Sequence, residues 1–545
     1  MARPGRWTLL HLGSLGLVLA FVVYCARGQW FFGDEWDFLV FRGIRGTHLL
    51  GLWAPHNEHW STIPILLWRA VFHFVGIGSY WPYMGLLFAA HLLAVHFLWR
   101  ILKRLPHVSP ALAVAGAAVL GLYGAGWEDL LWAFQIGFVG SLAFGLGLVA
   151  AIDEHGSTNR VAAVSVGAVL SLMMSGISVV MLGVVGLTAL GKWGWRKALE
   201  VTVPAGAVYA FWFTRYGQPS IDAQDQLHGT LSDIPRYVVG GVGGTLGEFV
   251  GQRSIGTYLL IALGAVTVWF LRRWIRTAPE ALAMAAGGVA LYVVISQGRG
   301  ALPQPATSRY LYLSAGLLIP IVVVAIAEAT KRWKGAQIIA VVATLAVVVV
   351  GARGLERESQ VQRRIDLANR GQFIAAEQLA ASGIHLVSDQ PQSPFAPDLK
   401  IADLVSLRQR NKSFTQPVNA RDEAGARLAL QVGSTEREPT DRTLGDTRVT
   451  KLPQFSLRPT GKGCMRIDAH GGNVEVQMGG RSAFSITSPN AGIVQLFVPY
   501  EGGYAGPRYV GLKPGVTTTL VSDLVGPMVV QLLPGVSEMC GITWQ

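Results

Sequence analysis

The sequence predicts a polytopic α-helical membrane protein with about 11 transmembrane helices and a C-terminal extracytoplasmic β-rich domain. Apolar runs of about 20 residues recur over the first 350 positions, each long enough to cross a bilayer. Only 14% of the residues are charged, against roughly 25% in soluble domains. Near residue 352 the apolar runs end and charged residues become frequent. We therefore expect a transmembrane domain over residues 1–352 and an extracytoplasmic α/β-rich domain over residues 353–545.

The formal net charge of +12 is distributed in short Lys and Arg clusters between the apolar runs. Clusters at 103–104, 192–197, 272–276 and 331–334 fall on one side, as the positive-inside rule requires of cytoplasmic loops. A nucleic-acid binder would instead show a continuous basic stripe. No small-residue cleavage site is clear before Gln29, so the first apolar segment is expected to be retained with the N-terminus inside.

The expected spans follow the apolar runs in chain order. The run 161–190 is too long for one span, is broken at Ser175 and Gly176, and has cations at both ends, which predicts two short helices turning near the midplane. Segments 39–52 and 63–75 are about half a span long, which favours interfacial helices within a long outer loop, 26–80. The remaining spans are 8–24, 81–102, 111–123, 133–152, 198–213, 258–271, 281–296, 310–327 and 336–351, with further outer loops at 126–129, 215–254 and 297–308.

The C-terminal region combines one helix with short alternating strands. Residues 353–382 have a loose apolar face, whereas 473–478 and 492–498 alternate as strands do. The polar stretch 422–450 is expected to be a loop. Cys464 and Cys540 could form a disulfide if this region is extracytoplasmic, or remain two thiols, because spacing alone does not fix the geometry.

Aromatic residues in this region allow two interpretations. They could stack on sugar rings and give the domain a glycan-binding role, or they could form the core of a β-sandwich. The residues concerned are Tyr500, Tyr504, Tyr509 and Trp544.

Acids and histidines gather in the outer loops. Asp34, Glu35 and Asp37 follow the first span, where a lipid phosphate would lie, and are candidate bases for proton abstraction from an acceptor hydroxyl. Arg309 would begin a span at its outer end, where a guanidinium can pair bidentately with phosphate. The candidate substrate-binding residues are His56, Glu58, His59, Glu128, Asp129, Arg299, Arg309 and Tyr310.

Each of these residues also has a simpler interpretation. Acids in outer loops are commonly just solvated, and Arg309 could extend along the helix end to reach the interface. Asp34, Glu58 and His59 are candidate metal ligands, although their spacing matches no known metal motif. No cofactor is expected with certainty, and a requirement for a divalent cation is left open.

The acidic motif after one N-terminal span resembles the GT-C superfamily of membrane glycosyltransferases that use polyprenyl-phosphate sugars. The resemblance rests on Asp34, Glu35 and Asp37, on the loop with interfacial helices, and on the extracytoplasmic C-terminal domain, and it covers about residues 1–350. The stretch Ser308-Arg309-Tyr310 is similar to segments of actinobacterial members. The resemblance implies Asp34 as the base, assisted by Glu35 or Asp37, although the motif reads Asp-Glu rather than Asp-Asp.

The function expected from these features is transfer of a sugar from a polyprenyl-phosphate donor to a cell-envelope glycan or glycolipid acceptor on the outer face of a bacterial plasma membrane. A single acidic cluster without a separate nucleophile motif favours inversion at the anomeric carbon. The alternatives are a transporter or flippase for lipid-linked saccharides, which would place polar residues on broken helices at the midplane, and a ligase or polymerase that moves whole glycans. The sequence does not identify the sugar, the acceptor, the linkage or the oligomeric state.

Overall fold

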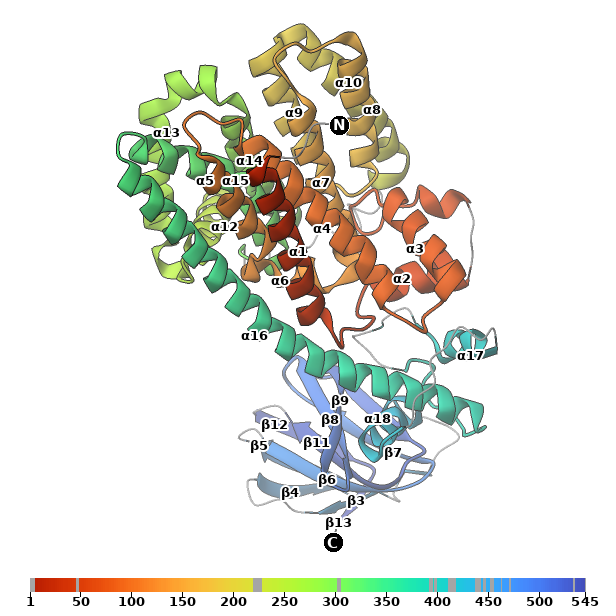
Figure 1. The fold of residues 1–545 in the computed structure, drawn as a ribbon. Helices are drawn as coiled ribbons and strands as arrows, with labels where there is room; N and C mark the ends of the chain where they lie inside the picture. Colours follow the sequence, from red (N-terminus) through yellow and green to blue (C-terminus); the bar gives the residue numbers. More distant parts are fainter. Residues whose placement is uncertain are drawn as a thin grey trace. The chain divides into compact units, whose positions relative to one another are not determined.

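The computed structural model shows a helical part followed by two β-sheets (Figure 1). It describes residues 5–45, 49–218, 228–300, 305–391, 396, 399–409, 418–436, 443–444, 447–450, 455–461, 463–469, 472–532 and 535–544. The α-helices are α1 Arg6–Ala26, α2 Glu35–Leu39, α3 Thr62–Val75, α4 Trp81–Leu102, α5 Pro110–Gly121, α6 Trp127–Leu131, α7 Ile136–Ala151, α8 Thr158–Leu172, α9 Ser178–Trp193, α10 Trp195–Trp212, α12 Ile234–Phe249, α13 Gly256–Thr277, α14 Pro279–Arg299, α15 Ser308–Thr330, α16 Lys334–Ala381, α17 Ile401–Gln409 and α18 Ala420–Gln431.

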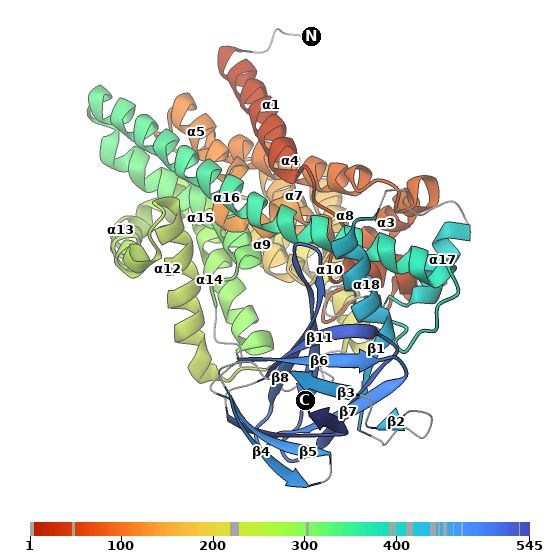
Figure 2. The same cartoon turned by 90° about the horizontal axis from the view of Figure 1, so that it is seen from below.

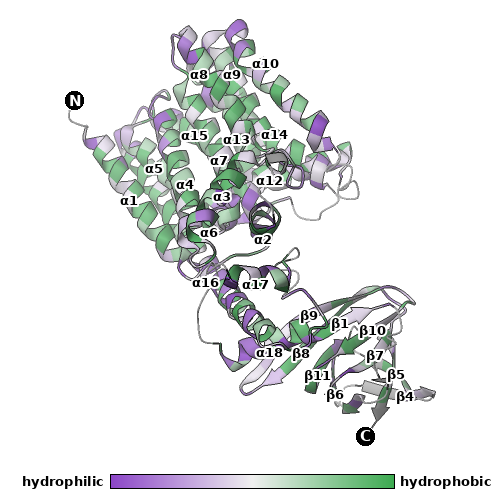
Figure 3. Ribbon diagram, turned by 90° about the vertical axis from the view of Figure 1, so that its right-hand side faces the viewer, coloured by the Kyte–Doolittle hydropathy of each residue, from purple (hydrophilic) through white to green (hydrophobic). Residues whose placement is uncertain are grey.

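Eight helical segments within the described residues are long and apolar enough to cross a membrane. Three shorter apolar helices, α3, α8 and α9, accompany them. Figure 3 shows that hydrophobic residues dominate helices such as α1, α4 and α15. The predicted class, a polytopic helical membrane protein with a β-rich C-terminal part, is confirmed. The qualifying segments are Arg6–Ala26, Trp81–Leu102, Pro110–Leu131, Ala133–Ala151, Arg253–Thr277, Pro279–Arg299, Ser308–Thr330 and Lys334–Ala381.

The long apolar run 161–190 does form two short helices. α8 ends at Leu172 and α9 begins at Ser178. Between them the Ser178 hydroxyl donates to the Ser171 carbonyl at 2.5 Å. The first outer loop contains α3 and a broken segment made of α2, a π-helix at Val40–Ile44 and a 3-10 helix at Leu49–Leu52.

Two local expectations were wrong. The predicted outer loop 215–254 contains α12, and the predicted loop 422–450 contains α18 and the strand Val432–Thr435. The predicted helix 353–382 is present, and it forms one continuous helix of 48 residues, α16, with the span that precedes it. Helix formation in these segments depends on packing, and their composition alone therefore does not reveal it.

The chain divides into two compact units, which are described separately. Unit 1 comprises Met1–Gln29, Thr47–Val71 and Tyr80–Arg363. Unit 2 comprises Trp30–Gly46, Phe72–Ser79 and Arg364–Gln545. The acidic segment after the first span therefore belongs to the same unit as the C-terminal region, while the expected domain boundary at residue 352 stays a prediction.

Unit 2 contains two mainly antiparallel sheets (Figure 2). One sheet has the order β1-β10-β7-β12-β5-β4, with β2 beside β7, and the other has the order β13-β3-β6-β11-β8-β9. The strands are β1 Val432–Thr435, β2 Thr443–Leu444, β3 Thr447–Thr450, β4 Phe455–Gly461, β5 Cys464–Ala469, β6 Gly472–Gly479, β7 Ser482–Thr487, β8 Gly492–Tyr500, β9 Gly503–Leu512, β10 Thr517–Ser522, β11 Val525–Leu532, β12 Gly535–Cys540 and β13 Ile542–Trp544.

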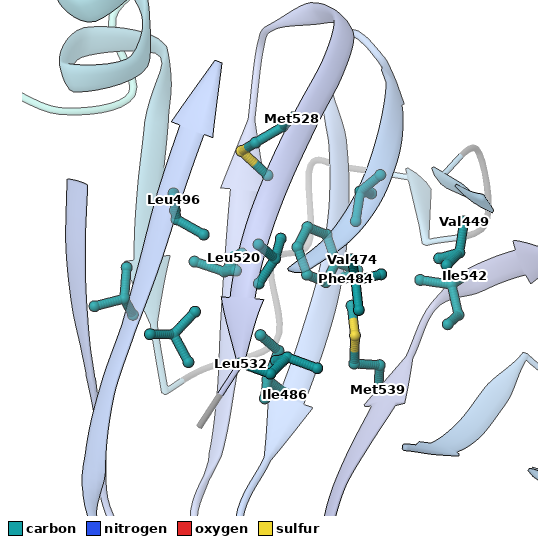
Figure 4. Close-up of a cluster of buried hydrophobic side chains, with 14 of the residues drawn as sticks. Val449, Val474, Phe484, Ile486, Leu496, Leu520, Met528, Leu532, Met539 and Ile542 are labelled. Carbon is teal, nitrogen blue, oxygen red and sulfur yellow. The ribbon is translucent and has the colours of Figure 1, made fainter. Parts of the chain in front are cut away.

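The core of this sandwich is aliphatic rather than aromatic (Figure 4). Both sheets contribute to one buried cluster that includes Phe484, Leu496 and Met528. Tyr504 and Tyr509 are exposed by 59% and 43%, so these two side chains do not form the core. The interpretation of these tyrosines as core residues was wrong, and the side chain of Trp544 lies outside the described residues.

Cys464 and Cys540 form a disulfide between paired positions of β5 and β12. The question that the sequence left open is thus answered in favour of pairing. Disulfides persist in oxidising compartments, which agrees with the expected extracytoplasmic location of this region.

Candidate functional site

The loop before α3 presents the first group of candidate residues. His56 and His59 form a short bridge, in which each backbone N–H donates to the other residue's carbonyl at 3.0 and 2.9 Å, and Asn57 adopts φ 50° at the turn. Trp60 stacks on Trp212 of α10, with ring centroids 5.2 Å apart. These contacts hold Glu58 and His59 in a fixed position within unit 1.

Glu58 pairs with an arginine that lies 241 positions later in the sequence. Arg299, the last residue of α14, places Nη2 3.0 Å from Oε1 and 3.2 Å from Oε2 of Glu58. The Tyr237 hydroxyl donates to the Arg299 carbonyl, and Arg236 donates to the Gly300 carbonyl at 2.6 Å. The end of α14 is therefore tied to α12 on the side where Arg299 reaches Glu58.

A cavity of about 480 Å³ lies beside this ion pair. Glu58, His59 and Arg299 line it together with Tyr310, in the first turn of α15, and Tyr209 of α10. Gly176, between α8 and α9, also lines it, and a Cβ there would lie 2.8 Å from His59 Nδ1. We call this space the Glu58 cavity.

Burial controls the pKa of His59, whereas neighbouring groups control that of Glu58. It lowers the pKa of the His59 imidazole from 6.5 to about 4, because the nearby Glu58 charge offsets only part of the desolvation. Burial alone would raise the pKa of the Glu58 carboxyl, but the charges of His59 and Arg299 hold it below its ordinary value. Since His59 is neutral near pH 7, Arg299 supplies the charge that keeps Glu58 ionised there.

A second cavity, of about 430 Å³, lies on the other side of the first turn of α15. Arg309 lines it, and its backbone N–H donates to Glu128 Oε2 at 3.1 Å, while the Glu128 N–H donates to the Ser308 hydroxyl at 3.0 Å. Arg253 and Arg357 also line it. We call this space the Arg309 cavity; three guanidinium groups suit it to an anionic group such as a phosphate.

Each arginine of the Arg309 cavity has a neighbouring carboxylate. Arg253 pairs with Glu248, and Arg357 Nη2 lies 3.0 Å from Glu358. Arg309 Nε is 3.7 Å from the nearest Glu128 oxygen, so its ion pair is loose. Of the three arginines, Arg309 therefore has the longest ion pair with a protein carboxylate.

Asp129 lines neither the Glu58 cavity nor the Arg309 cavity. Its side chain is fully buried, and neither carboxylate oxygen has a hydrogen-bond partner within the described part of the chain. His56 is also buried, with its ring edge-on to Phe134 at 5.0 Å. The proposed substrate contacts of Asp129 and His56 stay predictions.

The acidic segment in unit 2 is built into a local core. Glu35 is fully buried, and its Oε2 accepts the Phe32 N–H at 2.8 Å. Asp37 Oδ2 lies 3.4 Å from Arg42 Nε, while Asp34 is the N-cap residue of α2. Glu35 and Asp37 are therefore held by neighbouring groups of this local core.

Contacts with C-terminal residues shape this segment. Trp36 stacks on Phe373 of α16 at 5.2 Å, and Arg45 forms two hydrogen bonds with Asp403 of α17, at 3.1 and 2.8 Å. These partners leave no local sequence pattern, because the residues of each pair are more than 300 positions apart.

The predicted metal ligands do not assemble into a recognisable site within the described residues. The single group of three suitable side chains there is Cys464, Glu538 and Cys540, in which the two cysteines form the disulfide. A metal role for Asp34, Glu58 and His59 therefore stays a prediction.

No family model matches the chain, and no curated protein matches it. Among solved structures, it is similar to the crystal structure of ArnT from Cupriavidus metallidurans bound to undecaprenyl phosphate, with a TM-score of 0.42 and 16% identity over 68% of this chain and 80% of that chain. This similarity assigns no ligand and no residue role to the present chain. The fold defines a multi-pass membrane protein with a β-sandwich in its C-terminal part.

Proposed function

We propose that the protein is a glycosyltransferase that moves a sugar from a polyprenyl-phosphate donor to a cell-envelope glycan or glycolipid on the outer face of the bacterial plasma membrane. The observation that carries this proposal is the Glu58 cavity. It gathers Glu58, Arg299 and Tyr310 from segments far apart in the sequence. A carboxylate, a guanidinium and aromatic rings are the groups that bind sugar hydroxyls and a phosphate leaving group.

The cavities lie at helix ends that share one side of the membrane. Arg299 ends α14, and Arg309 begins α15 after a short connection, so both residues belong to the same side. In a bilayer, lipid phosphate groups lie near the membrane–water interface, where the ends of spanning helices are expected. The expected outer location of these loops agrees with the cationic clusters that fall on the opposite side.

The proposed reaction is a single displacement with inversion. A carboxylate takes the proton of the acceptor hydroxyl while its oxygen attacks the anomeric carbon, and the bond from that carbon to the phosphate oxygen breaks. Arg309 stabilises the charge of the departing polyprenyl phosphate, and Arg299 assists. A product that retains the anomeric configuration of the donor would rule out this mechanism.

Two carboxylates compete for the role of base. The resemblance to GT-C enzymes favours Asp34, assisted by Glu35 or Asp37. Glu58 is the alternative, because it lines a cavity and stays ionised through Arg299. Glu58 could equally position the acceptor through hydrogen bonds.

The test measures transfer from a panel of radiolabelled polyprenyl-phosphate sugars in membranes. Wild type is compared with Asp34→Asn and Glu58→Gln, which keep shape and remove the charge, and with Glu501→Gln, an exposed control in unit 2. We expect one donor to be consumed, and one of the two substitutions to abolish transfer at normal expression. Consumption of no donor would overturn the enzyme proposal.

A transporter of lipid-linked saccharides is the second candidate. The break between α8 and α9 favours it, since Gly176 at this break lines the Glu58 cavity and broken helices form transport sites. Movement of a labelled lipid-linked saccharide across proteoliposomes, without formation of a new glycosidic bond, would support it. A ligase or polymerase would instead be recognised by transfer of whole glycans.

A further inference from the structure

A crevice in unit 2 lies between α18 and the edge strand β9. α18 covers β8 and β9, and its last turn points its carbonyl groups toward the end of the helix. The Val387 N–H donates to the Leu430 carbonyl at 2.8 Å, which brings the chain before α17 to the same place. Three segments of unit 2 therefore enclose one small region.

Arg508 occupies the centre of this region. The pairing of β8 with β9 shifts register between Leu496 and Val498, next to Gly506 and Pro507. Such bulges redirect the side chains around them. Gly506 has φ 130°, and a Cβ there would lie 2.7 Å from the Leu496 carbonyl oxygen, so the bulge depends on glycine.

The Arg508 guanidinium has no acidic partner within 4 Å in the described part of unit 2. Its hydrogen bond goes to the Ala429 carbonyl, near the C-terminus of α18. Burial lowers the pKa of Arg508 to about 10, so the group remains charged at neutral pH. By contrast, Arg427 on the outer face of the same helix lies 2.8 Å from Glu423.

The contact with Ala429 gives Arg508 a structural role as a cation at a helix C-terminus. This role uses one of the five N–H donors of a guanidinium. A half-buried guanidinium with unused donors and no carboxylate within 4 Å among the described residues is suited to an anionic ligand.

Two cavities meet at this guanidinium. One, of about 210 Å³, is lined by Gln372, Gln390 and the half-exposed ring of Tyr509. The other, of about 410 Å³, is lined by Ser388 and by Asp389, whose carboxylate pairs with Lys400 at 2.8 Å. Both are lined by Ser434 and Arg508. Amide and hydroxyl groups around an aromatic ring are the groups that bind sugar hydroxyls and sugar faces.

We propose that this crevice binds an acidic saccharide, with the carboxylate or phosphate of the sugar on Arg508 and a neighbouring ring against Tyr509. The sequence allowed a glycan-binding role for the C-terminal region. This proposal assigns that role to one site and specifies a negatively charged glycan as the ligand. It does not depend on the transferase proposal, because the site lies wholly within unit 2.

The experiment measures binding to the purified full-length protein in detergent by isothermal titration calorimetry. The probes are di-galacturonate, its neutral counterpart digalactose, and galactose 6-phosphate. We expect the acidic probes to bind at least tenfold more tightly than digalactose. Comparison of the two acidic probes distinguishes a uronic acid from a sugar phosphate.

Variants identify the site. Arg508→Gln is expected to remove the preference for acidic probes. Arg427→Gln, which removes an exposed arginine of the neighbouring helix α18, should leave binding unchanged. Tyr509→Ala should weaken the binding of all three saccharides. Because the Tyr509 side chain is exposed, the substitution is not expected to unfold the domain. Equal binding of acidic and neutral probes to the wild type, or unchanged binding in a folded Arg508→Gln variant, would overturn the proposal.

Discussion

Arg299 donates to both carboxylate oxygens of Glu58, at 3.0 and 3.2 Å, although 241 positions separate the two residues. This contact joins the first outer loop to the connection between α14 and α15. It also keeps the partly buried Glu58 carboxylate charged beside a cavity. The pair is thus the strongest structural reason for placing ligand chemistry in this part of unit 1.

Loss of Arg299 should impair both folding and activity. Arg299→Gln leaves the Glu58 carboxylate without its charge partner, and hydrogen bonds to charged groups contribute about 1.5–3 kcal/mol. We expect destabilisation of that order and at least a tenfold loss of transfer. A double-mutant cycle with Glu58→Gln, followed by thermal unfolding, should show positive coupling. Additive losses would show that the contact is incidental.

Gly176→Ala tests whether His59 must approach the break between α8 and α9. The new Cβ would lie 2.8 Å from His59 Nδ1, so the imidazole has to move. We expect a decrease in kcat or an increase in KM with little change in the melting temperature. Gly183→Ala is the matched control, since a Cβ at Gly183 meets nothing within 4 Å. Equal effects of the two substitutions would argue against a role for His59.

The pH dependence of stability should report the burial of His59. Its folded pKa of about 4 lies below the unfolded value of 6.5. As the pH falls below 6.5 the unfolded state gains a proton that the folded state does not bind, so stability decreases down to about pH 4. The contribution is at most about 3 kcal/mol.

The measurement is thermal unfolding between pH 7 and 4.5. His59→Gln should flatten the loss of stability, whereas His155→Gln, at an exposed histidine, should not. A wild-type slope in the His59 variant would mean that this imidazole titrates normally.

Arg309→Lys keeps the positive charge and removes the planar fork that suits phosphate. If the Arg309 cavity holds the donor phosphate, we expect about a tenfold increase in KM for the lipid-linked donor. Arg276→Gln, at the far end of α13 and on the opposite side of the helical part, is the control. An unchanged KM in Arg309→Lys would move the phosphate to the Glu58 cavity and Arg299.

The sequence predicted the helices whose apolar runs are long, and it predicted the break between α8 and α9 from its flanking cations. It missed α12 because glycine is a poor helix former in isolation. In the structure the glycines of α12 allow close packing. A Cβ on Gly241 would collide with Tyr292, and a Cβ on Gly256, the first residue of α13, would collide with Gly243. Small residues of this kind form helix contacts in membranes.

The candidate site was predictable only in part. Residue types and loop positions indicated Glu58, Arg299 and Arg309, but not that the first two form one ion pair. Arg299 and Arg309 line different cavities. At the start of α15, consecutive residues point in different directions around the helix, so Tyr310 lines the Glu58 cavity with Arg299, while Arg309 lines the other cavity. An ion pair between residues 241 positions apart leaves no pattern in the local sequence around either residue.

The disulfide between Cys464 and Cys540 should stabilise the β-sandwich without affecting the membrane helices. It links the first residue of β5 to the last residue of β12 across a separation of 76 residues, and loss of a native disulfide typically costs about 2–5 kcal/mol. Cys464→Ser with Cys540→Ser should therefore lower the melting temperature of the sandwich, and Cys25→Ser, at a buried free cysteine of α1, supplies the control that removes no disulfide. Non-reducing electrophoresis after thiol labelling should detect one free thiol in the wild type. Detection of three free thiols in protein isolated from membranes would place the sandwich in a reducing compartment and contradict the proposed outer location.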